Sequence, residues 1–114
     1  MERGISFLAA RDYKTAKSEL LKAKPFTTGD VRALTALAAA ADMEGDFKLS
    51  DRAYEILLTR SGDQVMLFNN MGYSYMLRGD LVRAASYLNE AARRDPNNPI
   101  VKNNLAMLRQ VAPI

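Results

Sequence analysis

The chain has 114 residues, of which 48% are hydrophobic and 25% charged, a composition typical of a folded globular protein. It contains no Cys and no His, which excludes disulfides, thiolate zinc sites, nucleophiles activated by an imidazole and histidine pH switches. Its longest apolar stretch, residues 33–41, is interrupted by Thr35 and is far shorter than the roughly 20 residues of a membrane span.

A helical period runs through the sequence. Apolar residues recur three and four positions apart, as at Leu34, Leu37, Ala38 and Ala41, whereas alternating strand patterns are rare. Segments containing Gly, Pro, Asn or Asp interrupt this period. Between them the pattern predicts an all-α chain of about seven helices, in order over residues 1–11, 13–27, 31–44, 47–60, 64–78, 81–95 and 100–114.

The predicted helices repeat at a constant spacing, which we call the repeat period. Asp12, Asp46 and Asp80 are separated by this period, and Gly45 and Gly79 precede the last two. The same offset joins three further sets: Phe7, Ala41 and Tyr75; Ala16, Ser50 and Ala84; and Leu20, Tyr54 and Leu88. A helix–turn–helix unit that recurs about every 34 residues is typical of a tetratricopeptide array.

The third repeat resembles the tetratricopeptide repeat family most closely, through Phe68, Met71, Gly72, Tyr75, Gly79, Ala84, Leu88, Ala91 and Pro96. The resemblance implies an all-α tetratricopeptide-repeat α-solenoid, a right-handed superhelix of helix–turn–helix units. We expect a single domain over residues 1–114, with a truncated first repeat at 1–28, a second at 31–64, a third at 65–98 and a capping helix at 99–114.

Small residues and turn residues recur at fixed places in each repeat. Close approach of two helices needs small side chains at the crossing, which predicts the pairs Gly4 with Ala16, Ala38 with Ser50, and Gly72 with Ala84. Gly45 and Gly79 are predicted to end their helices in a left-handed conformation, and Asp46 and Asp80 to cap the helices that follow. Arg11 occupies the corresponding glycine position in the first repeat.

The start of the chain carries Ile5, Phe7 and Leu8 on a half-length first helix. These side chains are expected to leave apolar surface uncovered, which predicts a homodimer through the open first repeat. We also expect the sequence to lie inside a longer natural protein.

Two charged clusters have simple explanations. Asp42, Glu44, Asp46 and Asp51 lack the order of a calcium loop, so helix-end charges and an N-cap are the favoured interpretation. No spacing of Asp, Glu, Lys or Tyr indicates a reaction, so we expect no enzymatic activity, no metal and no cofactor.

The second cluster is basic. Residues 1–28 carry six basic and three acidic side chains, while residues 29–114 carry ten of each, within a net charge of +3. Phosphates are attracted to such clusters, but a solvated helix surface on the convex side is the favoured interpretation of Lys14, Lys17, Lys22 and Lys24. RNA-binding helical repeats read their ligands along first helices, where only Arg32 is a clear cation.

The candidate binding site lies on the first helix of each repeat, on the face turned away from the partner helix. In tetratricopeptide proteins this face lines the concave groove that holds peptides. Its members here are Arg32, Thr35, Ala36, Ala39, Met43, Met66, Asn69, Asn70, Tyr73, Leu77, Ile100, Asn103, Asn104 and Met107.

This set predicts an extended or helical protein segment as partner, bound by Met contacts and amide hydrogen bonds. For each Met, simple core filling is an equally good interpretation. Thr35, Met66 and Asn70 replace the basic residues with which family members bind a C-terminal carboxylate, so no carboxylate clamp is expected.

Two amide pairs, Asn69–Asn70 and Asn103–Asn104, are separated by the repeat period. Asn is only a moderate helix former, so its repeated use inside helices indicates something to hydrogen-bond. Either the amides bind the main chain of a ligand, or one member of each pair bridges adjacent helices. Both interpretations are open from the sequence.

Residues 66–109 also resemble the repeat domain of TadD-type proteins of bacterial tight-adherence (Flp/Tad) pilus assembly, through residues 69–75 and 103–109. In that family the repeats follow an export signal and a lipidated Cys and support assembly of the outer-membrane secretin. The resemblance implies a type IVb pilus adaptor that is periplasmic or anchored to the outer membrane if those elements precede this sequence, and cytoplasmic otherwise. The alternatives are a nucleic-acid-binding helical repeat and a regulatory domain of a larger enzyme.

Overall fold

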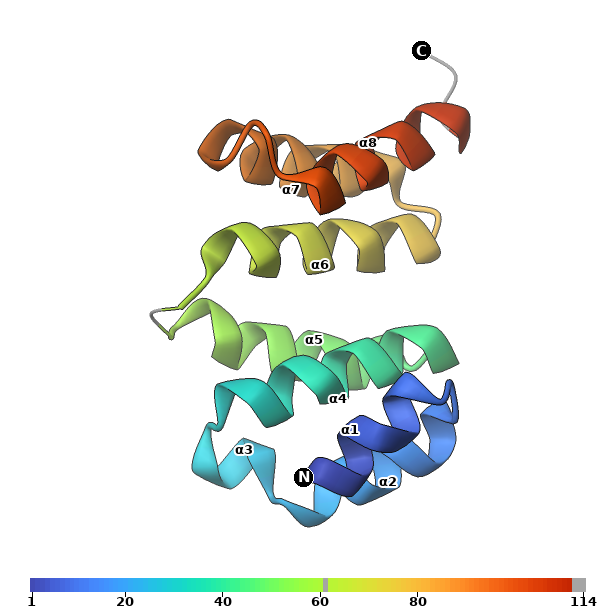
Figure 1. Ribbon diagram of the computed structural model, residues 1–114, viewed down its shortest axis with the longest axis vertical. Coiled ribbons are helices and arrows are strands. Elements are labelled where there is room, and N and C mark those ends of the chain that lie inside the picture. The colour runs from blue at the N-terminus through green and yellow to red at the C-terminus, as the bar shows by residue number, and fades with distance from the viewer. Residues whose placement is uncertain (61, 112–114) are drawn as a thin grey trace. The chain divides into compact units, whose positions relative to one another are not determined.

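The computed structural model describes residues 1–60 and 62–111, and every regular element in these ranges is a helix (Figure 1). The elements are α1 (Glu2–Ala9), α2 (Tyr13–Lys22), α3 (Pro25–Thr28), α4 (Val31–Glu44), α5 (Phe47–Leu58), α6 (Gln64–Leu77), α7 (Leu81–Arg94) and α8 (Pro99–Val111). The prediction of an all-α chain is confirmed. None of these helices is long and apolar enough to span a membrane.

The prediction of about seven helices is corrected by α3. The sequence pattern predicted one helix over residues 13–27, but the chain leaves the helical conformation at Lys24, whose φ is 52°. Pro25 then starts a new turn of helix, which ends at Gly29. Proline disfavours a helical conformation in the residue before it, so the Lys24–Pro25 step breaks the helix.

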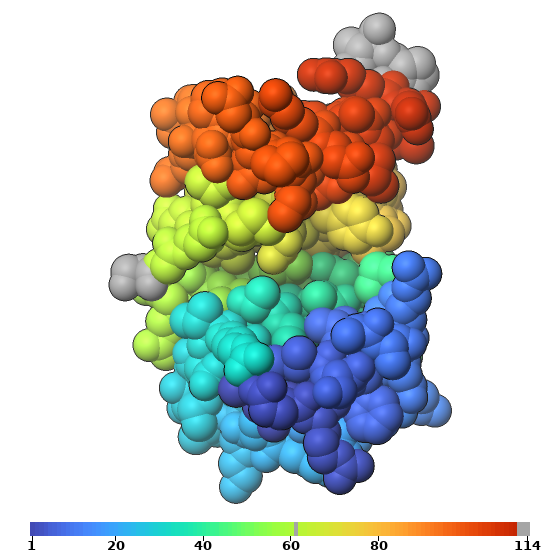
Figure 2. All heavy atoms as spheres, in the orientation of Figure 1, coloured from blue at the N-terminus to red at the C-terminus, as the bar shows by residue number. Residues whose placement is uncertain are grey.

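The chain divides into two compact units, residues 1–60 (unit 1) and residues 61–114 (unit 2). In unit 1, helices α1 to α5 surround a core that includes Leu20, Ala36 and Leu37. In unit 2, α6 and α7 form a helix pair on which α8 packs, around Ala84, Leu88 and Leu108. Figure 2 shows the atoms of α7 (orange) and α8 (red) in contact. The single domain expected over the whole chain stays a prediction.

The turns between paired helices contain the left-handed residues and aspartate caps that the sequence predicted. Gly45 and Gly79 have φ of 75° and 78°, and Arg11 has φ of 62° at the equivalent place. The following aspartates accept hydrogen bonds from main-chain N–H groups three residues later: Asp12 from Thr15, Asp46 from Leu49 and Asp80 from Arg83. The predicted left-handed glycines and aspartate N-caps are therefore confirmed.

The crossing of α6 and α7 depends on Gly72. A Cβ atom at this position would lie 2.6 Å from Cγ of Leu88 and 3.3 Å from the carbonyl oxygen of Ala84. These distances are shorter than ordinary contacts, so the crossing needs glycine here, and the predicted approach of Gly72 to Ala84 is confirmed.

The final helix, α8, differs from α6 on one face. Lys102 and Arg109 follow Phe68 and Tyr75 by one repeat period, and both are exposed. The opposite side of α8 buries Val101, Asn104 and Leu108. Charged side chains thus occupy positions that are aromatic in the preceding repeat, as expected for a helix that covers the end of a core.

The apolar surface expected at the chain start is smaller than predicted. Ile5 and Leu8 pack against the core of unit 1 that contains Leu20 and Leu37, and Phe7 is half-buried. Helices α2 and α4 therefore supply most of the cover for α1. The proposed dimer stays a prediction.

Candidate functional site

A buried amide–amide hydrogen bond joins α6 to α8. Asn104 donates from Nδ2 to Oδ1 of Asn69 over 2.8 Å, and both side chains are buried. One member of each predicted amide pair therefore bridges adjacent helices. The partners are 35 residues apart, one more than the repeat period.

Around this bond lies a surface that we call the α6–α8 face, made of the site residues of unit 2 that the sequence predicted. On α6 they follow a three- and four-residue spacing, so they form one stripe, and Met66, Asn70 and Tyr73 in it are half-buried. Leu77 at the end of the stripe is 41% exposed. The α8 side of the face consists of Ile100, Asn103 and Met107.

The α8 side of the face exposes large apolar side chains. Ile100 is 50% exposed and Met107 37% exposed, and Asn103 between them is exposed as well. Val111 continues this stripe at 56% exposure. Val111 was not among the predicted site residues, although its position four residues after Met107 places it on the same side of the helix.

The other predicted site residues lie on α4 in unit 1. Arg32 forms an ion pair with Glu2 of α1, and Thr35 donates its hydroxyl hydrogen bond to the carbonyl oxygen of Val31 over 2.8 Å. Ala36 is buried, Ala39 is half-buried and Met43 is exposed. Arg32, the one clear cation expected on the first helices, is thus already paired.

Lys17 of the basic cluster forms ion pairs within unit 1. Its Nζ lies 3.2 Å from Glu44 and 3.3 Å from Asp46. Hydrogen bonding to Glu44, and less to Asp46, raises the pKa of Lys17 above its usual value. Lys22 pairs with Glu19 on its own helix. Lys17 thus connects α2 to the end of α4, whereas Lys22 pairs on the surface of α2.

Asp42, Glu44 and Asp46 of the predicted acidic cluster have partners within unit 1. Glu44 and Asp46 pair with Lys17, and Asp42 accepts a hydrogen bond of 2.7 Å from the Tyr54 hydroxyl. Within residues 1–60 and 62–111, no group of three Asp or Glu side chains is arranged to hold a metal ion.

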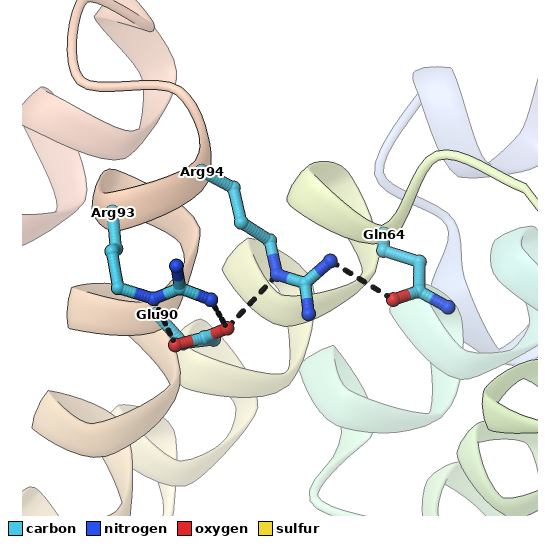
Figure 3. A network of polar contacts seen from close by, with 4 residues as sticks. All are labelled: Gln64, Glu90, Arg93 and Arg94. Carbon is cyan, nitrogen blue, oxygen red and sulfur yellow. Dashed lines mark hydrogen bonds and ion pairs between the residues drawn. The ribbon is translucent and has the colours of Figure 1, made fainter.

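The outer surface of α7 is strongly charged. Glu90 accepts hydrogen bonds from Arg93 and Arg94, and Arg94 also donates to Gln64 at the start of α6 (Figure 3). The hydrogen bonds from Arg93, and then those from Arg94, lower the pKa of Glu90 to about 2. The Arg94 guanidinium also lies 5.0 Å from the centre of the Phe68 ring. These contacts tie the end of α7 to the start of α6.

Comparison with known families identifies the repeat in unit 2. Residues 65–98, which comprise nearly all of α6 and all of α7, match the model described as "Tetratricopeptide repeat". Comparison with curated proteins found no significant match. The chain therefore has an all-α fold and contains a tetratricopeptide repeat, at residues 65–98.

Proposed function

We propose that this protein is a non-catalytic adaptor that binds a segment of another protein on the α6–α8 face. Tetratricopeptide repeats are in general modules for protein–protein interaction and typically have no catalytic role. The observation that carries the proposal is the exposure of Leu77 on α6 and of Ile100 and Met107 on α8, the two helices that the buried amide bond joins. Large apolar side chains left exposed on neighbouring helices are a feature of interaction sites.

The predicted site residues of α4 are proposed as a separate binding surface of unit 1. Met43 offers exposed apolar surface, and Ala39 and Thr35 lie beside it on the same stripe of the helix. Because Arg32 is paired with Glu2, we expect it to contribute less than a free cation to a partner or to nucleic acid.

The experiment is a selection of binders from a randomised peptide library against the full chain. Binding of the selected peptides is then compared between the parent, the double variant Leu77→Ser with Ile100→Ser, and Val82→Ser. Val82 is 83% exposed on α7, outside the proposed site, and is therefore the matched control. We expect at least about tenfold weaker binding to the double variant, because two apolar contacts are lost, and little change for the control. Equal binding to parent and double variant would refute the site.

A role in Flp/Tad pilus assembly is a narrower proposal. It is supported only by the resemblance of residues 66–109 to TadD-type proteins. A two-hybrid assay against the pilus secretin and pilotin-like proteins of the source genome tests it, with the Leu77→Ser and Ile100→Ser protein as control. If only components outside pilus assembly interact through this face, the pilus role is wrong while the adaptor function stands.

A further inference from the structure

We infer that the α6–α8 face selects an uncharged, extended segment and that Asn103 hydrogen-bonds to its main chain. This inference rests on the proposed function and adds to it the chemistry of the partner. Three features carry it: the distribution of charge in unit 2, the different positions of the two α8 amides, and the length of the α6 stripe from Met66 to Leu77.

Charge is absent from one side of the helices and abundant on the others. Helix α6 contains no Asp, Glu, Lys or Arg from Gln64 to Leu77. Helix α8 has two basic residues, but at about 100° per residue Lys102 and Arg109 lie roughly 160° and 180° around the helix from Ile100. On α7, Arg93 and Arg94 are bound to Glu90, and Arg83 pairs with Asp80.

An ionised side chain on a bound segment would therefore lose water at this face and gain no partner of opposite charge. Such desolvation without compensation opposes binding. An apolar side chain instead covers Leu77, Ile100 or Met107 and gains from the burial. The face thus complements an uncharged segment and rejects both acidic and basic ones.

The two amides of α8 have different environments. Asn104 is buried and donates to Asn69, so it holds the helices together. Asn103 is exposed, and among the described residues the structure gives its amide one contact, from Nδ2 to the Met107 sulfur at 3.9 Å. A thioether is a weak acceptor, so the donors and the oxygen of Asn103 remain available to a ligand.

A side-chain amide can bind main-chain groups only where those groups have no internal partner. In a helix the main chain is already hydrogen-bonded, whereas an extended segment presents N–H and C=O groups at its edges. The stripe from Met66 to Leu77 covers eleven helical steps, or about 16 Å, which about five extended residues span. Alternate side chains of such a segment would face the stripe.

The test uses a randomised seven-residue library with uncharged linkers at both ends, selected against the full chain. Binding of synthetic, terminally blocked versions is measured for the parent and for Met107→Glu, Ala106→Glu and Asn103→Ala. Met107 and Ala106 are adjacent and exposed, but lie on different sides of α8, so their variants carry the same charge change at different faces. Thermal melts establish that each variant is folded.

We expect uncharged peptides with apolar side chains at alternate positions. Met107→Glu should weaken their binding at least tenfold and Asn103→Ala about five- to tenfold, as expected for a lost hydrogen bond, while Ala106→Glu changes it less than about twofold. Charged peptides that depend on Met107 would overturn this inference and leave the proposed function standing. Peptides that bind as helices, or that ignore Asn103→Ala, would overturn the extended mode. Peptides that ignore Met107→Glu, or a library that yields no binder, would overturn both proposals.

Discussion

Removing the amide bond between α6 and α8 should destabilise the protein in a way that a double-mutant cycle can measure. The variants are Asn69→Ala, Asn104→Ala and the combination of the two. The hydrogen bond is 2.8 Å long and both side chains are buried. Each single change leaves the other amide buried without this partner, which costs about 1 to 3 kcal/mol of unfolding free energy.

The double variant should lose little more stability than either single variant. Once both amides are gone, neither member of this bond is left buried without its partner, and alanine gains up to about 0.7 kcal/mol of helix propensity at each position. The coupling energy between Asn69 and Asn104 should therefore be about 1 kcal/mol or more. In a domain of this size each kcal/mol lowers the melting temperature by roughly 4 to 8 °C.

Urea unfolding followed by far-UV circular dichroism measures these free energies, and Asn103→Ala is the matched control. This variant makes the same chemical change on the same helix at an exposed position, so its effect should stay within about 0.5 kcal/mol. Additive losses in the double variant, or single variants no less stable than the control, would refute the assigned role of the bond.

Of three further predictions, two rest on the structure and the third, the dimer, rests on the sequence. Gly72→Ala should lower the free energy of unfolding by about 1 to 3 kcal/mol because the new Cβ overlaps Leu88. Gly62→Ala, where the Cβ meets open space, should not. If the two variants unfold at the same urea concentration, the close crossing at Gly72 is contradicted. Because the pKa of Glu90 falls from 4.5 to about 2 on folding, its stabilising contribution is present above pH 4.5 and disappears as the pH falls to about 2. Glu90→Gln should therefore flatten the acid limb of the stability profile in that window, and an unchanged limb would count against the arginine contacts. Sedimentation should detect a concentration-dependent dimer that Phe7→Glu disrupts; a parent that stays monomeric at high concentration would end the dimer hypothesis.

Most of the helices, their repeat period and their turns could be predicted from the sequence. These features depend on interactions between residues three or four positions apart, so they can be read without knowing the packing. The aspartate caps and the left-handed Gly45 and Gly79 are examples, because each requirement is local to one turn. The helix break between Lys24 and Pro25, which forms α3, is also local because proline restricts the residue before it. It could therefore have been predicted from the sequence.

Contacts between side chains of different helices could not be predicted in the same way. The repeat period aligns Asn69 with Asn103, yet the hydrogen bond joins Asn69 to Asn104 and leaves Asn103 exposed. Arg32 likewise belongs to the predicted site by its spacing, but it pairs with Glu2, far away in the sequence on α1. Such contacts depend on how far each packed helix is rotated about its axis and shifted along it. Burial of the whole apolar core sets that rotation and shift, so they cannot be predicted from a local pattern of residues.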